Sequence, residues 1–152
     1  MRGKAEMSVL TRRNLMLAAG AAAAGGFAVW TLQPEFEGAE MTPEEAHAAA
    51  SSGDILLIDI RRPDEWKLTG VGAGAAPLDM RRDDFVAALT ALAEGDTARP
   101  IALICARGVR SARMSRRLEQ AGFTRIIDVP EGMLGSRAGP GWLKRGLPVV
   151  EG

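Results

Sequence analysis

The sequence predicts one α/β domain with a mostly parallel central sheet and helices on both faces, a three-layer arrangement. Short apolar runs alternate with segments of helical periodicity along most of the 152 residues, and this alternation is typical of a parallel sheet. Without the first ~40 residues the chain retains about 110, which is enough for one small core. One apolar run ends at Cys105, the only cysteine, so we expect a ligand site at that strand end.

The N-terminal segment, residues 1–32, has the pattern of an export signal or a membrane anchor. Arg12 and Arg13 precede an uncharged run of eighteen residues, 15–32, which is rich in alanine and glycine. The paired arginines match the twin-arginine export signature, and an ordinary secretory signal is the alternative. Eighteen apolar residues are just enough to cross a bilayer, so cleavage and retention as a single-span anchor both stay open. Either outcome places the folded domain outside the cytoplasm, in the periplasm, and makes the export machinery a partner.

A linker is expected over 33–40 and the folded domain over 41–150. In the first predicted helix, 43–50, Thr42 can cap the N-terminus and Pro43 suits the first turn. His47, the sole histidine, is expected to be exposed on this helix. The other expected elements are a strand over 55–60, a helix near 63–67, a short strand around 75–78, a helix over 84–93 capped by Asp83, a strand over 101–105, a helix over 111–121 and a strand over 125–129.

Cys105 lies where a strand passes into a helix, and this position favours a reactive thiolate over the thiol. The free N–H groups and the positive dipole end of a helix N-terminus stabilise an anion there. Arg107 and Arg110 add positive charge, and Gly108 gives the loop a conformation that a side chain restricts. A small buried cysteine is the alternative. The arginines and the glycine favour a nucleophile, because packing a cysteine requires none of them.

Four residues separate Cys105 from Arg110, one fewer than in the loop of tyrosine phosphatases. A phosphate ester needs a wider ring of donors, whereas a shorter loop suits one additional sulfur atom held as a persulfide. The charge balance of 19 basic and 19 acidic residues gives no signal for nucleic acid binding.

Residues 41–150 resemble the rhodanese-like domain family of sulfurtransferases. The most specific match is the loop Cys-Ala-Arg-Gly-Val-Arg-Ser, residues 105–111. Residues 59–66, 74–78 and 142–150 resemble other blocks of the family. The chain departs from the family at two places: no Gly-His-Ile follows Trp66, and Glu131-Gly132 stands where the family has Gly-Gly.

The resemblance implies a sulfurtransferase that carries sulfane sulfur as a persulfide on Cys105, without a metal or an organic cofactor. A small donor such as thiosulfate supplies the sulfur, and a thiol or cyanide accepts it; a protein acceptor is the alternative. A sulfur-relay partner and a catalytically quiet binding module are further alternatives. A phosphatase or arsenate reductase fits the loop length less well.

Each site residue has an expected role. Arg110 closes the loop by bonding carbonyls or a carboxylate, Arg107 points toward substrate, and Ser111 caps the following helix. Ala106, Gly108 and Val109 complete the substrate-binding loop together with Arg107 and Ser111. Asp59, Arg61 and Glu65 are expected to orient neighbouring loops, and a surface ion pair is the alternative for the first two.

Overall fold

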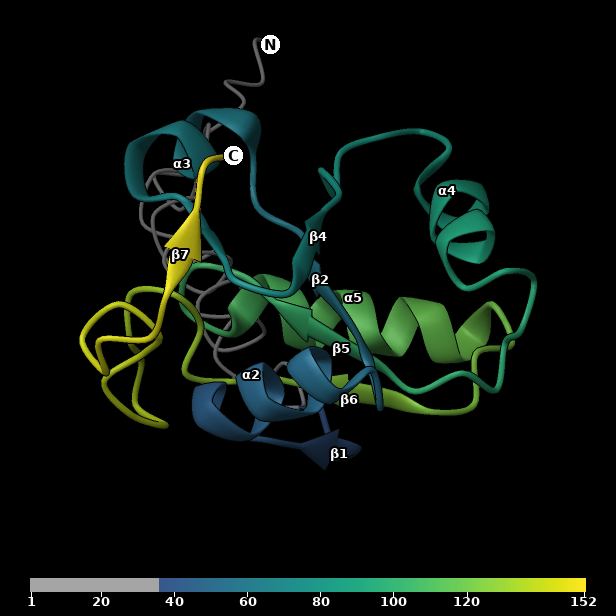
Figure 1. Ribbon diagram of the computed structural model, residues 1–152. Coiled ribbons are helices and arrows are strands. Elements are labelled where there is room, and N and C mark those ends of the chain that lie inside the picture. The colour runs from purple at the N-terminus through teal and green to yellow at the C-terminus, as the bar shows by residue number, and fades with distance from the viewer. Residues whose placement is uncertain (1–35) are drawn as a thin grey trace, which may run out of the picture. The chain divides into compact units, whose positions relative to one another are not determined.

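The computed structural model describes residues 36–152, which fold around a five-stranded parallel sheet in the order β1-β6-β5-β2-β4 (Figure 1). The parallel sheet with helices on both faces confirms the predicted fold class. The elements are β1 (Ala39–Glu40), α2 (Pro43–Ser52), β2 (Leu56–Asp59), α3 (Pro63–Thr69), β3 (Val71–Gly72), β4 (Ala75–Pro77), α4 (Phe85–Leu92), β5 (Ile101–Ile104), α5 (Val109–Gln120), β6 (Ile126–Asp128) and β7 (Val149–Val150).

The two sides of strand β5 bury different clusters, as the alternation of side chains along a strand requires. Ile101, Leu103 and Cys105 belong to the cluster that α4 and α5 cover. Ala102 and Ile104 belong to a second cluster on the opposite face, which α2 covers with the help of C-terminal residues. All four residues of β5 are buried, so the strand that delivers Cys105 is held from both sides.

Trp142 belongs to the second cluster. Its side chain is fully buried, and its indole N–H donates to the Pro148 carbonyl at 3.0 Å. His47 packs edge-on against this indole with ring centroids 5.5 Å apart, and its Nδ1 lies 3.1 Å from the Ala73 carbonyl oxygen. The expectation of an exposed His47 was therefore wrong: the ring is half-buried, because it fills the gap between α2 and Trp142.

The predicted N-cap is correct for helix α2 and wrong for helix α4. Thr42 caps α2 as expected, with the Glu45 N–H donating to its hydroxyl at 3.3 Å and a reciprocal bond from the Thr42 N–H to Glu45. Helix α4 starts one residue later than predicted, so Asp84 occupies the N-cap and Asp83 does not. Asp84 makes no side-chain cap because its carboxylate binds Arg82.

The domain begins within the segment expected to be a linker. Phe36 is buried in the first cluster, and β1 adds an edge strand to the sheet by pairing with β6. The linker prediction of 33–40 was therefore wrong for residues 36–40. The sequence also did not predict the antiparallel pair β3–β7, because strands of two residues carry too little periodicity.

The twin-arginine motif and the apolar run 15–32 lie outside the described residues. Within residues 36–152, no helix has the length and apolarity needed to cross a membrane.

Candidate active site

Cys105 follows the last residue of β5 and places its sulfur beneath the first turn of α5. Its side chain is 1% exposed. The Gly108 N–H donates to Sγ at 3.1 Å, and the Ser111 hydroxyl oxygen lies 3.5 Å from Sγ. A backbone donor and a hydroxyl therefore surround the sulfur at the amino end of a helix, where partial positive charge favours an anion.

Gly108 fixes the shape of this loop. Its φ of 82° lies in the left-handed region, and a Cβ there would come 2.2 Å from the Pro130 carbonyl oxygen. Only glycine allows the loop to pack directly on the segment that follows β6. The same close approach occurs from the other side, where a Cβ on Gly132 would lie 2.6 Å from the Ala106 carbonyl.

Helix α5 begins at Val109, half a turn earlier than predicted, and this changes the role of Ser111. Gly108 is the N-cap and has no side chain, so the expectation that Ser111 caps the helix was wrong. Ser111 is fully buried within the first turn, and its hydroxyl donates to the Gly108 carbonyl at 3.0 Å. Its oxygen consequently lies beside the Cys105 sulfur.

Arg110 binds a carboxylate, one of the two kinds of partner that the sequence allowed. Its two terminal nitrogens donate to both oxygens of Glu65 on α3, at 2.7 and 2.6 Å. This pair holds the pKa of Glu65 well below its usual range, at about 2, and a bond from the Arg62 N–H contributes further. The pKa of Arg110 is raised chiefly by Glu65 and additionally by Cys105, so the guanidinium acts on the sulfur as well.

Asp59 and Arg61 form a buried ion pair, which excludes the surface alternative. Arg61 is 1% exposed and Asp59 is fully buried, with the shortest contact between them 2.7 Å. The other Arg61 donors bond the Thr69 hydroxyl at 2.8 Å and the Gly70 carbonyl at 2.6 Å. The pair thereby ties the end of β2 to the end of α3, the helix that presents Glu65 to Arg110.

The rest of the predicted substrate loop lies at the surface above the sulfur. Arg107 is exposed and its guanidinium reaches the Gly135 carbonyl at 3.4 Å, while Val109 is 67% exposed. Ala106 is half-buried, and its carbonyl accepts the Leu134 N–H at 2.9 Å. The loop is therefore anchored through its backbone and exposes the side chains of Arg107 and Val109.

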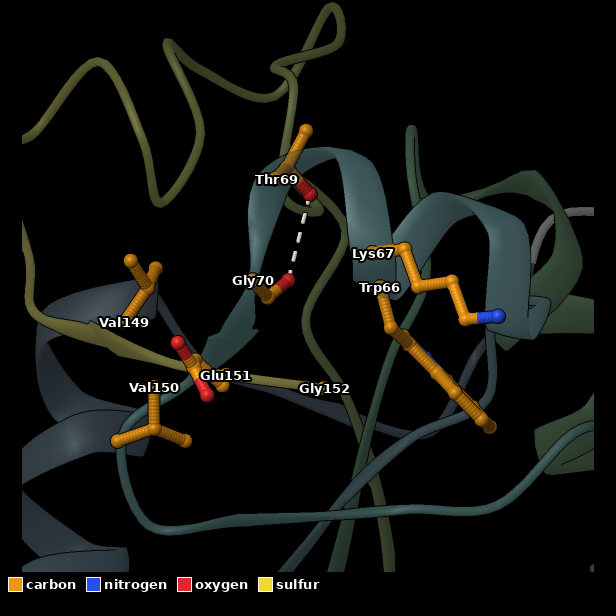
Figure 2. A pocket seen from close by; sticks show the side chains of 8 residues that line it. All are labelled: Trp66, Lys67, Thr69, Gly70, Val149, Val150, Glu151 and Gly152. Atoms are coloured by element: carbon orange, nitrogen blue, oxygen red, sulfur yellow. Dashed lines mark hydrogen bonds between the residues drawn. The ribbon is translucent and has the colours of Figure 1, made fainter.

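A cavity of about 410 Å³ lies apart from this loop, between α3 and the C-terminal residues (Figure 2). Figure 2 shows the Trp66 ring on one side of it and β7 on the other. None of its lining residues belongs to the Cys105 loop, so we do not assign it to the thiol chemistry. The lining residues are Trp66, Lys67, Thr69, Gly70, Val149, Val150, Glu151 and Gly152.

Two acidic residues near the loop were missed by the sequence analysis. Asp128, at the end of β6, is 1% exposed, and burial raises its pKa to about 6. Glu131 is 3% exposed and accepts bonds from Arg145, at 2.8 and 2.6 Å, and from the Gly141 N–H. A signal for Asp128 existed, because it ends the strand beside β5, and carboxyl ends of parallel strands share one edge.

These residues together define a protected thiol with donors placed for an anion. The Gly108 N–H donates to the sulfur, the Ser111 hydroxyl oxygen lies 3.5 Å from it, and the Arg110 guanidinium interacts with it electrostatically. Such a group suits nucleophilic attack without a histidine base. The fold and this loop define a class of α/β proteins that carry a nucleophilic cysteine where a strand passes into a helix.

Comparison with known proteins assigns the chain to a family within this class. The model of the rhodanese-like domain matches residues 42–137, and the chain belongs to that family. No curated protein sequence matches the chain. The family match includes the Cys105 loop, β2, α3 and β6, all of which contribute to the site.

Solved structures with the same fold include sulfurtransferases. The polysulfide-sulfur transferase homodimer of Wolinella succinogenes is 23% identical, with a TM-score of 0.56, over 95% of this chain and 93% of that one. Thiosulfate sulfurtransferase from Pseudomonas aeruginosa is 20% identical, with a TM-score of 0.59, over 76% of this chain and 20% of that one. A Rhodopseudomonas palustris protein of unknown function, possible tyrosine phosphatase, is 19% identical, with a TM-score of 0.55, over 99% of both chains.

Proposed function

We propose that the protein is an exported sulfurtransferase that moves a sulfane sulfur from a donor such as thiosulfate to a thiophilic acceptor. The observation that carries the proposal is the setting of the Cys105 sulfur, 3.1 Å from the Gly108 nitrogen and within the influence of Arg110. Membership of the rhodanese-like family supports it, and so does the likeness in fold to two sulfurtransferases.

In the first half-reaction the Cys105 thiolate attacks the outer sulfur of the donor. A new S–S bond forms on Cys105 while the S–S bond of thiosulfate breaks, and sulfite leaves with the electron pair. The Gly108 N–H and Arg110 stabilise negative charge on the sulfur before attack. The Arg107 side chain, at the exposed surface of the loop, is placed to meet an anionic donor.

In the second half-reaction the acceptor attacks the outer sulfur of the persulfide. The bond from that sulfur to Cys105 breaks, and the electron pair returns to Cys105 as thiolate. Cyanide then leaves as thiocyanate, and a thiol acceptor leaves as a persulfide. The cycle is a ping-pong reaction with a covalent persulfide intermediate on Cys105, and it uses no cofactor.

Loop length argues against phosphoryl chemistry, even though one neighbour in fold is a possible tyrosine phosphatase. The four residues between Cys105 and Arg110 leave one backbone donor fewer than a phosphatase loop. The protein should therefore hydrolyse para-nitrophenyl phosphate no faster than its Cys105→Ser variant.

The test of the proposed reaction is thiocyanate formation from thiosulfate and cyanide. The unmodified protein should form thiocyanate, and Cys105→Ser should not, because the chain has no other thiol. Thiocyanate formation by Cys105→Ser above the uncatalysed rate contradicts the assignment. A protein that forms none but still folds favours the quiet binding module.

Export is the second part of the proposal, and it rests on Arg12 and Arg13 before the uncharged run 15–32. Replacing both arginines with lysine keeps the charge, so a general secretory signal still functions, whereas twin-arginine export stops. Cell fractionation of the double-lysine variant distinguishes the two routes. Full-length protein in the cytoplasm supports the twin-arginine route, and unchanged extracytoplasmic protein contradicts it.

A further inference from the structure

The loop of residues 131–141 closes on a buried carboxylate, that of Glu131. Glu131 is 3% exposed, and its two oxygens accept bonds from Arg145, at 2.8 Å from Nε and 2.6 Å from Nη2. The Gly141 N–H donates to the same carboxylate at 2.9 Å, so one side chain joins the two ends of the loop. Gly139 lies directly against this side chain, because a Cβ there would come 2.4 Å from Cδ of Glu131.

The backbone of the 131–141 loop holds the backbone of the Cys105 loop. The Met133 N–H donates to the Cys105 carbonyl at 2.9 Å. The next N–H, that of Leu134, donates to the Ala106 carbonyl, also at 2.9 Å. The two loops are packed backbone to backbone here, since a Cβ on Gly132 would lie 2.6 Å from the Ala106 carbonyl. The conformation of one loop therefore constrains that of the other.

The donor that binds the sulfur packs against the residue that precedes Glu131. The Gly108 N–H donates to Sγ of Cys105 at 3.1 Å, and a Cβ on Gly108 would come 2.2 Å from the Pro130 carbonyl oxygen. That carbonyl also accepts the hydroxyl of Ser136, within the 131–141 loop, at 2.7 Å. The loop that closes on Glu131 thus supports Gly108 as well as the Cys105 and Ala106 carbonyls.

Neither Glu131 nor Arg145 has a part in the proposed reaction. Glu131 stands at one of the two places where the chain departs from the rhodanese-like family, so the family resemblance assigns it no role. Arg145 binds a second carboxylate, that of Glu44 on α2, which attaches the arginine to the helix that covers the second cluster.

We propose that Glu131, fixed by Arg145, is a positioning residue for Cys105: it holds the 131–141 loop against the Cys105 loop and so keeps the Gly108 N–H on the sulfur. The inference rests on Cys105 being the nucleophile of the proposed reaction. When the pair is broken, the Gly108 donor is no longer held in place, and the thiolate forms less readily. A residue that only stabilises the fold leaves the ionisation of the thiol unchanged.

The pH profile of Cys105 alkylation by iodoacetamide tests the proposal without a sulfur donor, so its outcome is independent of the sulfurtransferase assignment. The full-length chain and Glu131→Gln are compared from about pH 5 to about pH 10, the range over which thiols ionise. The midpoint should lie higher in Glu131→Gln, so that the thiolate fraction at pH 7 falls at least about threefold, as expected for one weakened hydrogen bond. The midpoint decides, because a thiol that is merely more accessible reacts faster at every pH and keeps its midpoint.

Two further variants of the same network separate positioning from the loss of any ion pair. Glu44→Gln removes the other carboxylate that binds Arg145 but keeps every bond of Glu131, so its profile should equal that of the unmodified chain. Arg145→Lys keeps a cation beside Glu131 and loses the two parallel bonds, so its midpoint should rise by less than in Glu131→Gln. Unchanged midpoints in Glu131→Gln and Arg145→Lys overturn the proposal, and Arg145→Lys decides alone if Glu131→Gln does not fold.

Hydrogen exchange tests the link between Glu131 and the Cys105 loop separately. The Met133 and Leu134 amides, which donate to the Cys105 loop, should exchange at least about threefold faster in Glu131→Gln because the loop opens more often. The Leu78 amide, which donates to Asp59 at the edge of the sheet, is the control and should keep its rate. Equal exchange of the Met133 and Leu134 amides in the two proteins contradicts the proposal.

Discussion

The carboxylates on the two sides of Cys105 lie in opposite electrostatic environments. Toward α3 each buried or half-buried carboxylate has an arginine: Asp59 binds Arg61, and Glu65 binds Arg110. Toward β6, Asp128 is buried, its Oδ1 atom has no hydrogen-bond partner, and burial raises its pKa. The pKa of Glu65 is about 2 and that of Asp128 about 6, although both carboxyls lie close to the same loop.

This contrast shows that residue type alone does not fix the function of a carboxylate near a nucleophile. The Glu65 carboxylate, whose pKa Arg110 lowers to about 2, stays ionised over the physiological range and holds Arg110 in place. Asp128, whose pKa burial raises to about 6, changes its protonation state within that range and therefore responds to pH. Environments that push two pKa values apart are a recurrent way of assigning different roles to similar side chains.

The largest expected effect comes from breaking the pair that is fully buried. Arg61→Met leaves the Asp59 carboxylate buried and uncompensated, so the free energy of unfolding should fall by about 3–5 kcal/mol. Urea denaturation measures the loss. Arg82→Met is the control, because its pair with Asp84 is exposed, and it should cost far less stability than Arg61→Met. Equal losses for the two variants contradict the assigned role of Asp59 and Arg61.

Asp128 should make the fold less stable as the pH rises. Its pKa in the folded protein, about 6, lies above the ordinary value of 3.8, so its contribution is complete below pH 3.8 and lost as the pH passes through 6. Between pH 4 and pH 7 the unmodified protein should lose about 2 kcal/mol more than Asp128→Asn. Urea denaturation at both pH values gives the difference, and parallel losses are the contradicting result.

Arg110→Ala should slow sulfur transfer by at least ~10-fold, or ~1.4 kcal/mol of transition-state stabilisation. The guanidinium supports the anionic sulfur, and lysine should restore only part of the rate because it lacks the planar fork of donors. Thiocyanate formation is the measurement. Arg99→Ala, which removes an arginine paired with Glu94, is the control and should keep the full rate. Normal turnover and normal thiol alkylation in Arg110→Ala rule out this role.

Glu65 should show the smallest effect, opposite in sign to that of Asp128. Its pKa in the folded protein is about 2, below the ordinary value of 4.5, so its contribution is complete above pH 4.5 and lost as the pH falls toward 2. Because solvent reaches both Glu65 and Arg110, we expect only about 1 kcal/mol between pH 5 and pH 2.5. Glu65→Gln should lack this acid-dependent loss in urea denaturation, and retention of the full loss in that variant contradicts the pairing.

Local patterns in the sequence predicted much of the fold. The alternation of apolar strands with helices predicted the parallel sheet, and Thr42 predicted the start of α2 correctly. The two-residue strands β1, β3 and β7 were missed because their pairing depends on contacts far away in the sequence. For the same reason, Phe36 was not recognised as a core residue.

The residues of the site that belong to the Cys105 loop could be predicted from the sequence. Cys105, Gly108 and Arg110 stand together in the sequence, so their proximity follows from the chain itself. The partner of Arg110 comes from α3, 45 residues earlier, and only the fold brings it near. The start of α5 was placed too late because Gly108 caps through its backbone, and a backbone cap leaves no side-chain signal.

The central claim, that Cys105 carries sulfur, is tested most directly by the intact mass of the protein after incubation with thiosulfate. We predict that the chain gains the mass of one sulfur atom and that cyanide removes it with release of thiocyanate. Cys105→Ser should gain nothing under the same conditions. An unmodified protein whose mass stays unchanged, or a Cys105→Ser protein that gains the same mass, contradicts the claim.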